Sequence, residues 1–247
     1  KNDNKKYDCI IFSAGYGQPS KFLDNPIETI ELNTSSLKIF ISKLKKGGKF
    51  LYLSSSEIYN KNQKKVINEN DIGFTNTDDP RACYIEAKRC GEAIANIYNK
   101  KFNIDIKIIR LCLTYGPGTK KKDARVLYEF INRSLKDEKL YVNDAGLAIR
   151  RYIYIVDAIQ MMLNIMLYGK SIVYNISGKE KITIGQLAKE IGKILIKPVY
   201  FKKKPSLEGA PKNISLSIKK YEDEFGKLKL LKIQEGLKRT IEWCKKL

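Results

Sequence analysis

Short apolar runs alternate with long amphipathic stretches over the first 111 residues, and this alternation constrains the fold more than any other feature. The runs at residues 7–14, 49–54 and 104–111 have the length and β-branched content of buried strands. The stretches at residues 26–46 and 81–101 have helical spacing. Strands that alternate with helices of this length predict right-handed crossovers. We therefore expect an α/β fold with a parallel sheet covered on both faces.

The rest of the chain has a less regular pattern, without a repeat or a low-complexity linker. Helices are expected near residues 125–135, 156–167, 184–194 and 233–246, and strands near residue 152 and residues 172–175. This half is predicted to form a smaller α/β lobe that is entwined with the first.

Composition excludes several classes of function. The chain has no histidine, which removes His-based triads and most zinc sites, so we expect no metal. Its five cysteines are scattered, which indicates reduced thiols in a cytoplasmic protein. No apolar run approaches membrane-spanning length, so no membrane partner is expected. The net charge is +20, but the basic residues are spread along a lysine-rich chain, and we expect no nucleic-acid partner.

Tyr84 and Lys88 carry the main chemical signal. A spacing of four residues on a helix places the phenol and the ammonium on one face. A nearby cation favours the phenolate, which converts Tyr84 into a usable base. The alternative is an ordinary surface pair, because this spacing often arises by chance. A predicted strand that ends in Ser54 and Ser55 favours the catalytic interpretation, because a hydroxyl there could share the substrate proton.

Five segments together resemble one known family. They are SSSEIY at 54–59, PRACYIEAKR at 80–89, RLCLTYGP at 110–117, DARV at 123–126 and IRRYIYIVDA at 149–158. The chain resembles the extended short-chain dehydrogenase/reductases that act on nucleotide sugars. Among these enzymes, it resembles the UDP-glucuronate decarboxylases most. The resemblance implies a Rossmann-type doubly wound parallel sheet, NAD as cofactor and a nucleotide-diphosphate sugar as substrate. It also implies a homodimer through the helices at 26–46 and 81–101.

The glycine turn GxxGxxG of this family does not occur in the sequence. Gly15 and Gly17 follow the first strand, but they lack the third glycine and match a later strand end of the family. The run at residues 7–14 resembles the fourth strand of the sheet. We therefore expect the N-terminal strands of the Rossmann sheet to be missing from these 247 residues, and the pyrophosphate-binding turn with them.

The resemblance implies four catalytic residues. Tyr84 would take the proton of the sugar 4-hydroxyl, and Ser55 would hydrogen-bond the same oxygen. Lys88 would hold the nicotinamide ribose and lower the pKa of Tyr84. Glu57 would act as a base near C5 or would hold the ring, and the alternative for it is a solvated loop carboxylate.

The implied binding residues fall into two sets. The cofactor-binding set is Ala14, Leu53, Ser54, Tyr84, Lys88, Thr114 and Arg125. The substrate-binding set is Tyr16, Arg125 and Arg150. Arginine can grip a phosphate through two parallel hydrogen bonds, although a solvated charge beside Arg151 is the alternative for Arg150.

The implied reaction is oxidation at C4 to a 4-keto sugar, followed by decarboxylation of a UDP-glucuronate-like substrate. A 4-epimerase or a 4,6-dehydratase with the same machinery is the first alternative. An inactive basic binding protein that retains the fold is an alternative of another class. Residues 1–113, with a contribution from 151–175, would form a partial NAD-binding Rossmann domain. Residues 114–150 and 176–247 would form the nucleotide-sugar-binding lobe.

Overall fold

A computed structural model describes residues 5–120, 123–136, 138–202 and 215–247. The chain divides into two compact units. The first unit comprises Lys1–Leu111, Gln160–Ile176 and Leu216–Lys227. The second comprises Cys112–Ile159, Ser177–Ser215 and Leu228–Leu247.

The first unit is built on a parallel sheet of four strands in the order β1-β2-β3-β7. The strands are β1 (Tyr7–Phe12), β2 (Leu44–Ser55), β3 (Asp105–Leu111) and β7 (Val173–Ile176). Ser54 pairs with Arg110 and Arg110 pairs with Asn175, so these three residues form one row across β2, β3 and β7. The expected parallel α/β sheet is confirmed.

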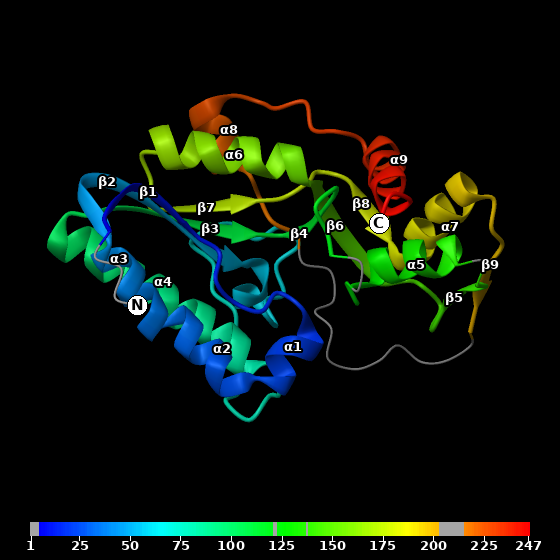
Figure 1. The fold of residues 1–247 in the computed structure, drawn as a ribbon, viewed down its shortest axis with the longest axis horizontal. Coiled ribbons are helices and arrows are strands. Elements are labelled where there is room, and N and C mark those ends of the chain that lie inside the picture. The colour runs from blue at the N-terminus through cyan, green and yellow to red at the C-terminus, as the bar shows by residue number, and fades with distance from the viewer. Residues whose placement is uncertain (1–4, 121–122, 137, 203–214) are drawn as a thin grey trace. The chain divides into compact units, whose positions relative to one another are not determined.

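Helices cover both faces of this sheet (Figure 1). On one face lie α2, α3 and α4, and on the other lie α8 and the part of α6 that belongs to this unit. The helices are α1 (Pro19–Asp24), α2 (Pro26–Asn33), α3 (Ser35–Ser42), α4 (Ala82–Phe102), α6 (Ile155–Tyr168) and α8 (Lys219–Phe225), with the short 3-10 helix η1 at Ser56–Tyr59. Gly91 lets α4 approach β2, because a Cβ there would lie 2.2 Å from the Tyr52 hydroxyl oxygen.

The single helix expected over residues 26–46 is instead two helices, which are separated at Thr34. The Thr34 N–H donates to the carbonyl of Glu31, three residues back. Its hydroxyl donates to the carbonyl of Ile30 at 2.8 Å. Side-chain bonds of this kind to the carbonyl four residues back bend helices.

The second strand also begins earlier than expected, at Leu44 rather than at Lys49. Its pairing with β1 shifts register between Tyr7 and Cys9. Gly47 lies within this irregular segment with φ +75°, a left-handed conformation that favours glycine.

The second unit contains a sheet in the order β4-β6-β8 and a two-stranded pair, β5-β9. The strands are β4 (Leu113–Tyr115), β5 (Leu140–Val142), β6 (Ile149–Tyr154), β8 (Lys181–Thr183) and β9 (Val199–Phe201). The helices α5 (Val126–Leu135), α7 (Ile184–Leu195) and α9 (Ile233–Cys244) lie within two residues of their expected positions. Their buried side chains, including Leu127, Ile131, Leu187, Ile191 and Leu237, form the core of this unit.

The limits of the units differ from those expected mainly in two places, apart from shifts of one or two residues at other limits. Residues 151–159 lie in the second unit, and residues 216–227 lie in the first. The second difference arises because α8 packs on β7 and because the Tyr221 hydroxyl accepts a hydrogen bond from Asn164 of α6 at 2.8 Å. Within the described residues, no helix combines the length and the apolar character needed to cross a bilayer.

Candidate active site

The candidate catalytic residues of the first unit gather where β2 ends and α4 begins. Ser55 is the last residue of β2, and its hydroxyl accepts a hydrogen bond from the backbone N–H of Glu57 at 3.2 Å. Tyr84 lies in the first turn of α4 and is buried. The Tyr84 and Ser55 side chains are hydrogen-bonded. The structure therefore brings the phenol to the carboxyl end of a parallel strand, where α/β sheets bind ligands.

An aromatic ring fixes the orientation of Tyr84. The Phe22 ring stacks on the Tyr84 ring, with centroids 4.7 Å apart and planes inclined by 13°. Ile85 packs in the same cluster, with Tyr16 and Cys83 against it. This packing restricts movement of the Tyr84 ring, whose hydroxyl lies toward Ser55.

The electrostatic state of Tyr84 differs from the expectation. Burial and the charge of Glu57 raise the pKa of Tyr84 to about 12, although the hydrogen bond with Ser55 and the charge of Arg81 lower it. The sequence predicted a pKa lowered by Lys88. Desolvation is the larger effect here, since it disfavours the charged phenolate. Tyr84 is therefore a phenol at neutral pH in this structure.

Lys88 lies beneath Tyr84 and is 5% exposed. Its Nζ donates to the carbonyl oxygen of Leu53 at 2.7 Å. The same atom lies 5.1 Å from the centroid of the Tyr52 ring and 6.0 Å from that of Tyr84. Burial lowers the pKa of Lys88 to about 8, and the charge of Glu92 opposes this effect. The ammonium thus lies near the Tyr84 ring and is almost completely buried.

Glu57 is paired and is not a solvated loop carboxylate. Its carboxylate forms an ion pair with the Arg81 guanidinium. The Glu57 side chain is 22% exposed and that of Arg81 is 17% exposed. The Arg81 guanidinium also lies 5.2 Å from the centroid of the Phe22 ring. Sequence analysis did not identify Arg81 as a site residue. Its position three residues before Tyr84 was the available signal.

The residues that follow β1 lie close to Tyr52 and Lys88. Ala14 packs against the cluster that contains Phe12 and Tyr52. A Cβ on the next residue, Gly15, would lie 3.7 Å from Lys88 Nζ. Tyr16 is tied elsewhere, because its hydroxyl donates to a Glu28 carboxylate oxygen at 2.7 Å. Ser54 points away from the phenol, since its hydroxyl donates to Glu92 at 2.6 Å.

The remaining candidates lie in the second unit. Arg125 is held by the Asp123 carboxylate, with contacts of 2.7–3.1 Å, and it donates to the Thr114 carbonyl at 3.4 Å. Arg150 lies on β6 and donates to the Ile149 carbonyl at 2.8 Å. Both arginines act on buried Tyr152 and lower its pKa, although burial raises it more. The structure thus brings Thr114, Arg125 and Arg150 to one part of this unit.

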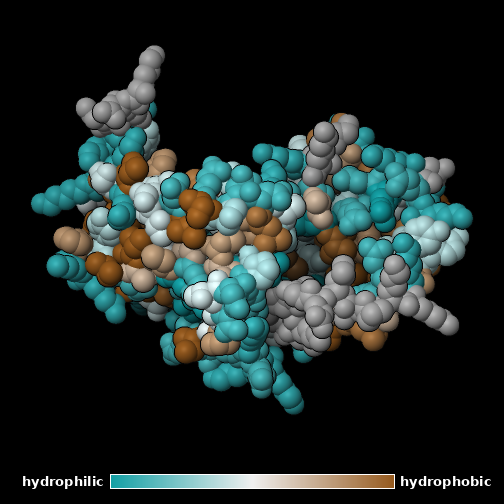
Figure 2. All heavy atoms as spheres, turned by 90° about the horizontal axis from the view of Figure 1, so that it is seen from below, coloured by the Kyte–Doolittle hydropathy of each residue, from teal (hydrophilic) through white to brown (hydrophobic). Residues whose placement is uncertain are grey.

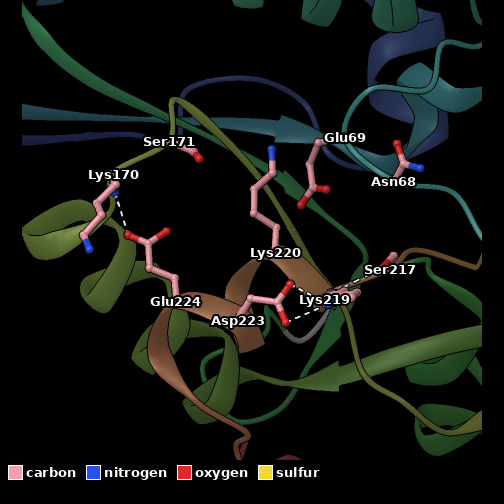
Figure 3. Close-up of a pocket in the computed structure, with 9 residues that line it drawn as sticks. All are labelled: Asn68, Glu69, Lys170, Ser171, Ser217, Lys219, Lys220, Asp223 and Glu224. Atoms are coloured by element: carbon pink, nitrogen blue, oxygen red, sulfur yellow. Dashed lines mark hydrogen bonds and ion pairs between the residues drawn. The ribbon is translucent and has the colours of Figure 1, made fainter.

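A separate pocket of about 670 Å³ lies in the first unit beside β7 and α8 (Figure 3). Several of its charged groups are bonded to other groups of the protein. Lys219 pairs with Asp223 at 2.6 Å, and Glu224 accepts the backbone N–H of Lys170 at 2.7 Å. Lys220 Nζ donates to the Val173 carbonyl at 3.1 Å. None of the predicted site residues lines this pocket.

Comparison with known proteins defines the class. Residues 2–177 match the NAD dependent epimerase/dehydratase family. The chain belongs to this family, which confirms the resemblance read from its motifs.

Its curated relatives include sugar-nucleotide decarboxylases. The UDP-glucuronic acid decarboxylase 1 of Danio rerio is 28% identical over 237 residues, which are 96% of this chain and 57% of that protein. The UDP-glucuronic acid decarboxylase 6 of Arabidopsis thaliana is 30% identical over 232 residues, which are 93% of this chain and 67% of that protein. The chain thus spans 57–67% of the length of these two relatives.

Solved structures share the fold. The UDP-glucose 4-epimerase of Thermotoga maritima, solved with UDP-glucose, matches with a TM-score of 0.85 at 24% identity. The aligned region covers 97% of this chain and 77% of the epimerase chain. A mutant UDP-glucuronic acid 4-epimerase of Bacillus cereus, in complex with UDP-4-deoxy-4-fluoro-glucuronic acid and NAD, matches with a TM-score of 0.84 at 23% identity. The aligned region covers 98% of this chain and 76% of the mutant epimerase chain.

The donor set at Lys88 fits a dinucleotide ribose. An ammonium carries three N–H donors, and one of them bonds to Leu53. A ribose offers vicinal hydroxyls that can accept from such donors, and Gly15 has no side chain beside Nζ, where a Cβ would lie 3.7 Å from it.

Proposed function

We propose that this chain carries the catalytic tyrosine and lysine of an NAD-dependent enzyme that remodels a nucleotide-linked sugar. The observation that carries the proposal is the placement of Tyr84 and Lys88 on one face of α4, against Ser55 at the carboxyl end of a parallel strand. Acid–base transfer at a sugar hydroxyl needs this combination of a buried phenol, a neighbouring hydroxyl and a cation.

Each residue has a defined part in this proposal. Tyr84 acts as the phenolate, once it has released its own proton, and takes the proton of the sugar 4-hydroxyl, while Ser55 holds the same oxygen. Lys88 binds and orients the nicotinamide ribose. When bound, NAD supplies a hydride acceptor for C4. Phe22 keeps the Tyr84 ring in place, and the phenol returns its proton when the hydroxyl is restored.

Glu57 and Arg81 extend the site toward C5 and C6 of the sugar in this proposal. The ion pair with Arg81 holds the Glu57 carboxylate in one orientation. Glu57 would act as a base at C5 in an elimination, or would hold the ring while a carboxylate leaves C6.

The substrate we favour is UDP-glucuronate, and the product is the decarboxylated pentose. A ketone at C4 makes the sugar acid a β-keto acid, so its carboxylate can leave as carbon dioxide while the ketone accepts the electrons. The two curated decarboxylases, at 28% and 30% identity, support this choice. A 4-epimerase or a 4,6-dehydratase uses the same first step and remains the alternative within the class.

The two units divide the work in our proposal. The first unit contributes the nicotinamide side of the NAD site through Ala14, Leu53 and Lys88. The second contributes the nucleotide-sugar site, with Arg125 and Arg150 directed to the diphosphate. Thr114, whose carbonyl accepts from Arg125, supports that cluster.

A direct experiment separates the alternatives. The longest natural form of the chain is purified and examined for tightly bound NAD, and UDP-, dTDP-, GDP- and CDP-sugars are then screened by mass spectrometry. Loss of carbon dioxide from UDP-glucuronate supports the decarboxylase, and loss of water supports a dehydratase. An isomeric product supports an epimerase. Neither bound NAD nor any conversion would indicate the inactive basic binding protein.

We further propose a homodimer through α2 and α4. Both helices expose apolar side chains on one face, including Ile27, Ile30 and Ile97 at 67%, 40% and 54% exposure. Figure 2 shows apolar side chains gathered on the face that these helices form. Light scattering tests this directly. Ile97→Glu should give a monomer, and Ile72→Glu, at an exposed loop position, should leave the dimer intact.

The setting we propose is the cytoplasm, because all five cysteines are free thiols. The proposed partner is a small polyanionic substrate and not a nucleic acid.

A further inference from the structure

Three consecutive residues at the end of β2 are each bound by one residue of α4. The Leu53 carbonyl accepts from Lys88 Nζ at 2.7 Å. The Ser54 hydroxyl donates to a Glu92 carboxylate oxygen at 2.6 Å. The Ser55 hydroxyl is hydrogen-bonded with Tyr84. The three α4 residues are spaced by four, so Glu92 continues the face of the helix that carries the phenol and the ammonium.

The Glu92 carboxylate is fixed by Arg110, whose side chain is 12% exposed. Arg110 Nη2 and Nε donate to Glu92 at 2.7 and 3.1 Å, and Glu92 is 6% exposed. Arg110 is itself held through Nη1, which donates to the Tyr59 hydroxyl and to the Glu69 carbonyl, both at 2.7 Å. The Glu92 carboxylate therefore accepts hydrogen bonds from both Arg110 and Ser54, which hold it in place.

The groups around Lys88 come from β2, α4, α2 and the segment that follows β1. From β2 they are the Leu53 carbonyl and the Tyr52 ring. From α4 they are Tyr84 and Glu92, and the Glu92 carboxylate pairs in turn with Arg110 of β3. Uncharged Asn33 of α2 and Gly15 complete the surroundings. Glu92 is therefore the anionic side chain on this side of the ammonium among the described residues.

We propose that Glu92, anchored by Arg110, is a positioning residue for Lys88: it sets a fixed negative charge one turn beyond the buried ammonium and so keeps that ammonium protonated. This inference rests on the proposed role of Lys88 at the NAD ribose, since a neutral amine would be a weaker donor there. Its physical basis is that a buried cation without a neighbouring anion releases its proton.

A purely structural role for the pair makes a different prediction. If Glu92 and Arg110 only join α4 to the sheet, their loss lowers stability and leaves the titration of Lys88 unchanged. If Glu92 acts on Lys88, the titration moves even where folding is intact. The pH dependence of Lys88 reactivity therefore separates the two roles.

The experiment measures that titration directly. Competitive acetylation with acetic anhydride over a range of pH, read by mass spectrometry of the peptide that contains Lys88, gives the midpoint at which the free amine appears. Glu92→Gln should lower this midpoint by about one pH unit, because an opposite charge within a few ångströms shifts a pKa by about one or more. Glu86→Gln, on the same helix, is the matched control and should leave the midpoint unchanged.

A second variant guards against misfolding. Glu92→Gln alone leaves the Arg110 guanidinium buried without its partner, which is strongly destabilising. Glu92→Gln combined with Arg110→Gln leaves no unpaired charge and should still lower the midpoint. A midpoint equal to that of the parent in the folded double variant would overturn the proposal.

The outcome is distinguishable from failure of the proposed function. The acetylation is performed without NAD or sugar, so it reports on Glu92 even if the chain converts no nucleotide sugar. A shifted midpoint with an inactive parent would retain the positioning role of Glu92 and reject the function. An active parent with an unshifted midpoint would retain the proposed function and reject the positioning role of Glu92.

Discussion

Glu57 and Arg81 form an ion pair beside Tyr84, and the two partners act on the phenol in opposite directions. The negative charge of Glu57 raises the pKa of Tyr84, and the positive charge of Arg81 lowers it. The pair therefore tunes the proton affinity of the base that we propose for the reaction.

Substitution of either partner should move the pH profile of turnover. Glu57→Gln should shift the acidic limb to lower pH, and Arg81→Gln should shift it to higher pH, because the limb follows deprotonation of Tyr84. Steady-state rates across pH measure both. If the acidic limb moved in the same direction in both variants, the opposite effects of Glu57 and Arg81 on the pKa of Tyr84 would be contradicted. If Glu57 is itself a base, Glu57→Gln should instead lose about 10²–10⁴ in rate at every pH.

Stability should depend on pH through Lys88. Burial lowers its folded pKa to about 8 from the usual 10.5. Between these values the unfolded chain holds a proton that the folded chain has released. The free energy of unfolding should therefore rise with pH in this window, by at most about 1.4 kcal/mol per pH unit.

Buried tyrosines reverse the trend at higher pH. The raised pKa of Tyr84 means that the unfolded chain loses its phenol proton first, so stability falls above about pH 10. Urea denaturation of the parent and of Lys88→Met measures both effects. The substitution should abolish the rise and keep the fall. An unchanged rise in Lys88→Met would assign it to another group.

Part of this site could be predicted from the sequence, because it depends on residues that are close together in the chain. A spacing of four residues alone places Tyr84 and Lys88 on one face of a helix. Ser55 follows from a strand that ends in hydroxyl residues. Glu57 and Arg81 could not be paired in this way, because they are 24 positions apart and meet only through the turn after β2.

Burial and side-chain competition account for what the sequence did not reveal. The pKa of Tyr84 depends on the Phe22 ring that covers it, and that ring lies far from Tyr84 in sequence. The break at Thr34 depends on one hydroxyl that bonds to its own helix. The strands of three residues in the second unit are too short for a pattern of alternation to mark them.

The close approach of α4 to β2 should be sensitive to one methyl group. Gly91→Ala would place a Cβ 2.2 Å from the Tyr52 hydroxyl oxygen. Such overpacking should lower the free energy of unfolding by about 1–3 kcal/mol. Gly17→Ala is the control, because nothing lies within 4 Å of its Cβ. Equal stabilities of the two variants in urea would show that the contact relaxes without cost.

Affinity for NAD should depend on a glycine turn that the 247 residues do not contain. Residues 1–247 alone should bind NAD at least about 100-fold more weakly than a chain extended through a GxxGxxG segment. The reason is that each charge-assisted hydrogen bond to the pyrophosphate contributes about 1.5–3 kcal/mol. Calorimetry on both chains measures the difference. Micromolar binding by residues 1–247 would place the cofactor site elsewhere.

Tyr84→Phe tests the central claim most directly. The change removes one hydroxyl and keeps the ring that stacks on Phe22, so the fold and the bound NAD should be retained. The measurement is the turnover of the preferred nucleotide sugar by the NAD-loaded protein. We predict a loss of about 10²–10⁴ in rate, the contribution of one general acid–base group. A rate within a few-fold of the parent would contradict the role of Tyr84 as the base of this enzyme.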